Sequence, residues 1–148
     1  MSGGIAEVTT RPRKIGQSIV ALAVGFFVNV ALTLPADVAM RAIGALPPLQ
    51  HPMNDVQSAL AFGYRTLFAV ISSYVVARLA PNRPMQHALI GAAIGMVLAT
   101  VGAVATRNIS LGPHWYALAL IVVALPTGWV GGKLREVQMR RSDSQTLS

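Results

Sequence analysis

Arg65 is the residue most able to do chemistry in this chain, because it lies within a long apolar stretch, residues 58–79. An arginine keeps its proton, so inside hydrocarbon it must find acceptors, reach outward along its stem or draw in water. One use would be contact with an anion or a lipid head group in a water-filled cleft. The other would be structural, with the guanidinium capping backbone carbonyls or pairing with Asp37. We favour the structural use.

Counting along the apolar stretches places further polar residues at the level of Arg65. Arg65, Asn29 and Thr100 each lie 14 residues from the same end of their stretches. In helices this corresponds to about 21 Å from one membrane boundary. The candidate binding set is therefore Arg65, Asn29 and Thr100, with Tyr64 adjacent in sequence and Asp37 as a possible counter-ion.

The chain carries no pattern typical of catalysis. His51, His87 and His114 are isolated from one another and from carboxylates, so no metal site is expected. The acidic residues all lie outside the apolar stretches, which argues against a proton relay across a membrane: Glu7, Asp37, Asp55, Glu136 and Asp143. There is no cysteine, no Walker loop, no G-x-S-x-G and no dinucleotide fingerprint. We expect no cofactor and no enzymatic activity.

Composition indicates an integral membrane protein. Of the 148 residues, 53% are hydrophobic and 11% are charged, against about a quarter charged in soluble domains. The mean hydropathy is +0.55. The net charge of +7 does not predict nucleic-acid binding, because the basic residues stand at the ends of apolar stretches, where they set topology.

The apolar stretches predict an all-α fold, an integral membrane four-helix bundle. Its expected spans are residues 15–34, 58–79, 86–105 and 115–134, flanked by cytoplasmic tails at 1–14 and 135–148. Pro35 is expected to end the first span, and the three prolines of 45–54 exclude a helix there. Asp37 and Arg41, four residues apart, are expected to pair on a short interfacial helix.

The distribution of Lys and Arg predicts the orientation. Nine lie at the ends of the spans that share a side with both termini, and two, Arg41 and Arg107, lie on the other side. Because positive residues concentrate in cytoplasmic segments, both termini are expected in the cytoplasm.

Small residues recur every four positions in three spans. Such faces let helices approach closely, which is a main source of association in lipid. We expect them to pack inside one bundle rather than to form a dimer face. The predicted packing residues are Gly91, Gly95, Ala99, Ala69, Ser73, Gly128 and Gly132.

Four sequence features carry a resemblance to a family. They are Tyr64-Arg65; Ala77-Arg78-Leu79-Ala80-Pro81 with Arg83-Pro84-Met85 and His87; Leu111-Gly112-Pro113-His114-Trp115-Tyr116; and Leu125-Pro126 with Gly131-Gly132-Lys133-Leu134. Through them, residues 58–134 resemble small bacterial inner-membrane proteins with four predicted spans and no assigned activity. The resemblance implies location and architecture, and no activity.

Three functions remain open from the sequence. The leading hypothesis is a non-enzymatic structural or accessory membrane component, with the lipid bilayer and other membrane proteins or a second copy as partners, and no nucleic acid. The second is a small transporter or channel-like protein that handles an anionic or polar solute at Arg65. The third is a lipid-interacting protein that uses its basic rim, where each Lys or Arg near anionic lipid contributes about 1 kcal/mol.

Overall fold

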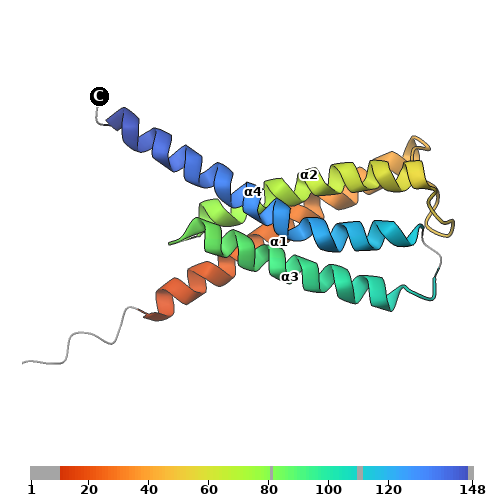
Figure 1. Cartoon of the computed structure of the whole chain (residues 1–148), viewed down its shortest axis with the longest axis horizontal. Coiled ribbons are helices and arrows are strands. Elements are labelled where there is room, and N and C mark those ends of the chain that lie inside the picture. Colours follow the sequence, from red (N-terminus) through yellow and green to blue (C-terminus); the bar gives the residue numbers. More distant parts are fainter. Residues whose placement is uncertain (1–10, 81, 110–111, 147–148) are drawn as a thin grey trace, which may run out of the picture.

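The computed structural model describes residues 11–80, 82–109 and 112–146, and these residues form four α-helices with short connections (Figure 1). The helices are α1 (Arg11–Ala42), α2 (Asp55–Leu79), α3 (Pro84–Ala105) and α4 (His114–Thr146). Each contains a segment long and apolar enough to cross a membrane. The prediction of an all-α chain with four helices of membrane-spanning length is therefore confirmed.

The first helix does not end at Pro35, and that prediction is wrong. Pro35 lies inside α1, which continues to Ala42. A proline removes one backbone donor and crowds the preceding turn, but membrane-type helices tolerate this where neighbouring groups satisfy the freed carbonyl. The helix stops instead before Gly44, whose φ of +77° lies in the left-handed region. Residues 43–54 contain no helix, as their prolines indicate.

The other helix ends also differ from the predicted spans. Helix α2 begins at Asp55, because Asn54 and Gln57 form a capping box that satisfies two backbone donors. Helix α3 begins at Pro84, a residue suited to a first helical turn. Helix α4 runs on to Thr146, so the predicted tail is helical from 135 to 146, whereas 147–148 and residues 1–10 of the N-terminal tail lie outside the described residues.

Successive helices run antiparallel, so α1 begins and α4 ends at the same end of the bundle (Figure 1). We call this the terminal end, and we call the opposite end, with residues 43–54 and 106–113, the loop end. Helix α2 contacts all three other helices, and α3 packs along α4. Helix α1 packs mainly on α2, touches α3 over a short stretch and does not pack on α4. The bundle is therefore asymmetric, with α1 set apart.

Glycines of α4 allow the closest helix contacts. A Cβ added at Gly132 would lie 3.2 Å from the Ala88 Cβ of α3, and Gly128 approaches Ala92 in the same way. On the other side, a Cβ at Gly131 would lie 2.6 Å from the Cβ of Ser73 in α2. Helix α4 therefore fits between α2 and α3 only because these positions lack side chains.

The row of small residues predicted on α3 does not form such a contact. A Cβ at Gly95 would meet nothing within 4 Å, and Gly91 approaches only side chains, with Leu22 of α1 at 3.3 Å. The packing prediction is wrong for Gly95, since α3 turns its neighbouring row, Ala88 and Ala92, toward α4. Ala69 and Ala99 line a cavity together with Gly91 and Gly95.

Candidate functional site

One face of α1 carries the polar groups that α2 meets. Gly25, Asn29, Thr33 and Asp37 recur every four residues, so they lie along one side of the helix. At the start of this row, the Ser72 hydroxyl donates to the Gly25 carbonyl oxygen, Oγ to O 2.6 Å, and the contact is buried. A polar seam therefore runs between α1 and α2.

An ion pair closes this seam at the loop end. The Arg65 guanidinium, through Nη2, pairs with Oδ2 of Asp37, and the Tyr64 hydroxyl donates to Oδ1 of the same carboxylate. The Arg65 and Asp37 side chains are 29% and 16% exposed, so both are partly removed from solvent. Each carboxylate oxygen has its own donor from α2. The geometry ties α1 to α2 through a neutralised charge.

This is the structural arrangement expected for Arg65, but it corrects the partner expected for Asp37. Asp37 pairs with Arg65 rather than with Arg41, whose Nη1 donates to the Pro47 carbonyl instead. Because α1 remains helical past Pro35, Asp37 stays on the row that faces α2. An acceptor for Arg65 there is worth more than an exposed pair one turn away.

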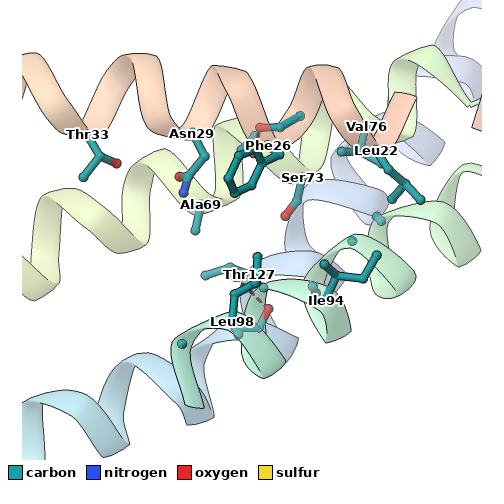
Figure 2. Close-up of a pocket in the computed structure, with 18 of the residues that line it drawn as sticks. Leu22, Phe26, Asn29, Thr33, Ala69, Ser73, Val76, Ile94, Leu98 and Thr127 are labelled. Carbon is teal, nitrogen blue, oxygen red and sulfur yellow. Dashed lines mark hydrogen bonds between the residues drawn. The ribbon is translucent and has the colours of Figure 1, made fainter. Parts of the chain in front are cut away.

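A cavity of about 690 Å³ lies between α1 and the other helices, inside the ion pair (Figure 2). All four helices line it, and both Asn29 and Arg65 are among its lining residues. Thr100 is not: its side chain is exposed, and its Oγ1 donates to the Met96 carbonyl at 2.8 Å. The predicted level thus brings two of its three residues together. Asp37 and Tyr64 lie beyond the cavity lining, at the ion pair.

Several buried polar atoms around the cavity have no hydrogen-bond partner in the described part of the chain. Asn29 Oδ1, Arg65 Nε and Thr66 Oγ1 belong to lining residues, and Tyr116 OH lies on α4 near the Arg65 guanidinium. The sequence reasoning missed Thr33, Thr66 and Tyr116 as members of the site. The four-residue spacing that links Asn29 to Asp37 would have found Thr33.

The terminal end of the cavity is closed by a second polar contact. His87 of α3 lies 2.8 Å from Ser18 Oγ of α1, measured at Nε2, and its Nδ1 lies 3.2 Å from the Arg83 carbonyl oxygen. Two turns along, Leu22 meets Gly91. His87 therefore bridges two helices rather than standing alone. Within the described residues, no group of three or more His, Cys, Asp or Glu side chains could hold a metal ion.

The fold and the site together are consistent with a multi-pass membrane protein held by an internal ion pair. A comparison of the chain with protein-family models, curated proteins and solved structures finds no match. The functional argument therefore rests on the residues and their geometry.

Proposed function

We propose that the chain is a multi-pass protein of the bacterial inner membrane with both termini in the cytoplasm. Large apolar side chains cover the outer faces of the helices, as at Phe27, Val38 and Val122, which are 68%, 67% and 71% exposed. In water such a surface would drive association, whereas hydrocarbon accommodates it. Nine of the 12 Lys and Arg residues flank the terminal end, which supports its cytoplasmic location. The bacterial source and the inner membrane come from the family resemblance.

Within that membrane, the proposed role is a non-catalytic structural or accessory component. The observation that carries this role is the Arg65–Asp37 pair with its Tyr64 donor. The one arginine deep in a span is used to hold α1 against α2. The connections between helices are short in the described chain, at residues 43–54, 80–83 and 106–113. They leave the apolar helix faces as the main surface for partners.

The transporter alternative has less support. An anionic solute at Arg65 would have to displace the Asp37 carboxylate, which already holds the guanidinium and the Tyr64 hydroxyl. Displacement would strand a buried carboxylate, which costs more than the pair itself contributes.

The lipid-interacting alternative has a specific observation in its favour. The cavity is bounded on α1 and α3 by apolar side chains that are also exposed, such as Phe27 and Leu98. It is compatible with an accessory role, since a bound lipid would contribute to the bundle.

Affinity purification from native membranes in mild detergent tests the proposed role. The full chain with a C-terminal tag should recover a defined membrane protein or a second copy in fixed ratio, which an equally tagged four-span protein of unrelated sequence should not recover. A chain that purifies alone and conducts chloride or sulfate in proteoliposomes, with flux lost in Arg65→Leu, would refute the structural role and favour transport.

A further inference from the structure

The cavity between α1 and α3 has two unlike walls. The wall from α1 and α2 contributes polar groups, among them Asn29, Thr66 and Arg65. The wall from α3 and α4 is apolar, with Ile94 and Leu98 facing α1 across the space in Figure 2. Its volume of about 690 Å³ falls within the range of about 300–1,000 Å³ found for small-molecule sites.

The cavity is closed at both ends and open at its side. Ser18 and His87 close the terminal end, and the Asp37–Arg65 pair closes the loop end. Between these closures, lining residues of α1 and α3 are exposed. Phe26 and Phe27 are 52% and 68% exposed on α1, and Ile94 and Leu98 are 46% and 49% exposed on α3. Residues that line the cavity and are exposed mark its opening, which faces bilayer hydrocarbon in the proposed location.

The polar wall offers a neutral hydrogen-bonding group rather than a charge. The Arg65 charge is matched by Asp37 at the loop end of the cavity. The Asn29 amide lies three turns further in, and its Oδ1 is buried with no partner in the described chain. Figure 2 shows this side chain directed from α1 past Ala69 toward the interior. Hydrocarbon cannot satisfy an amide, so a matching ligand supplies a neutral polar group at this depth.

We propose that the cavity binds one acyl chain of a membrane phospholipid, which enters between α1 and α3. The chain lies along the apolar α3 wall, and its ester carbonyl accepts a hydrogen bond from the Asn29 amide. A rigid helix of a second copy, about 10–12 Å across, would have to separate Leu22 from Gly91, whereas a flexible chain requires no such movement. The inference rests on the proposed membrane location and deepens the lipid-interacting role.

Two glycines of α3 provide a matched test. A Cβ at Gly95 or at Gly102 would meet nothing within 4 Å, so both positions accept a large side chain. Gly95 lines the cavity and Gly102 does not. Gly95→Phe fills the site, whereas Gly102→Phe places the same ring on the same helix outside it. Asn29→Leu removes the polar contact and leaves the space.

The experiment titrates the full-length protein in detergent with 1-palmitoyl-2-oleoyl-phosphatidylethanolamine and counts bound lipids by native mass spectrometry. Wild type and Gly102→Phe should retain one lipid per chain. Gly95→Phe should bind at least about tenfold more weakly, because the ring takes the place of two or more methylene groups. Asn29→Leu should bind about fivefold more weakly through one lost hydrogen bond.

Several outcomes would overturn the proposal. These are equal retention by the Gly95 and Gly102 variants, no lipid on the folded wild type, binding of oleic acid but not of the phospholipid, and a wild-type dimer without lipid that Gly95→Phe dissociates. Circular dichroism on each variant checks that the helices are formed. Recovery of the protein in the membrane fraction is scored separately, so loss of lipid binding is distinguishable from failure of the proposed location.

Discussion

Replacing Asp37 with leucine should destabilise the bundle by stranding the Arg65 guanidinium. In the wild type, the carboxylate takes one bond from Arg65 and one from Tyr64. Asp37→Leu removes both while keeping a side chain of similar size. Arg65 then faces the cavity wall with no anion within reach, in a place where Nε already lacks a partner.

The magnitude follows from the burial of the pair. Breaking a fully buried ion pair costs about 3–5 kcal/mol, and a hydrogen bond to a charged group contributes about 1.5–3 kcal/mol. The side chains are 29% and 16% exposed, so water screens part of the loss. We expect about 2–4 kcal/mol for Asp37→Leu. The double variant Asp37→Leu with Arg65→Leu should recover most of this, because no stranded charge remains.

Equilibrium unfolding in mixed dodecyl maltoside and sodium dodecyl sulfate micelles, followed by circular dichroism, measures the cycle. The matched control is the same cycle on Lys133 and Glu136, an exposed pair 3.5 Å apart and three residues apart on α4. Its coupling should stay below about 0.5 kcal/mol. The reasoning fails if Asp37→Leu unfolds within 0.5 kcal/mol of the wild type, or if the two single losses simply add in the double variant.

Three further outcomes are expected. Gly131→Ala should destabilise the same unfolding transition by about 1–3 kcal/mol, since its Cβ would lie 2.6 Å from a Cβ of α2; Gly63→Ala, with open space around it, should be neutral or stabilising, and equal losses would contradict this packing. Trp115→Phe should cost about 1 kcal/mol by removing the 2.8 Å bond from Nε1 to Asp55, and Asp55→Ala should add no further loss on top of it. Reporter fusions after residue 148 and near His51 should read cytoplasm and periplasm; a periplasmic C-terminus would exclude the four-span topology.

The sequence could predict the helices and the height of the site because both depend on position along the chain. Apolar stretches of about 20 residues mark each helix, and equal spacing from the ends placed Asn29 level with Arg65. Both line the cavity. The pairing of Arg65 with Asp37 could be anticipated from the cost of an isolated charge in hydrocarbon.

The rotation of each helix about its axis could not be predicted in the same way. Thr100 has the right height and the wrong side, so it bonds its own helix. On α3, the rows Ala88–Ala92 and Gly91–Gly95 lie on adjacent faces and look alike in sequence, yet only the first packs on α4. That choice depends on which neighbour arrives and how closely, which a single helix does not encode.

The pairing of a residue in α1 with one in α2 also bears on how the chain is made. Asp37 precedes Arg65 by 28 residues, so it leaves the ribosome first. Taken alone, α2 carries a charge that resists release from the translocon into lipid, at about 2.5–3.5 kcal/mol near a helix centre. Beside α1, that charge is neutralised. Helices α1 and α2 are therefore suited to partition into the bilayer together as a hairpin, with α3 and α4 added to a unit whose charge is already balanced.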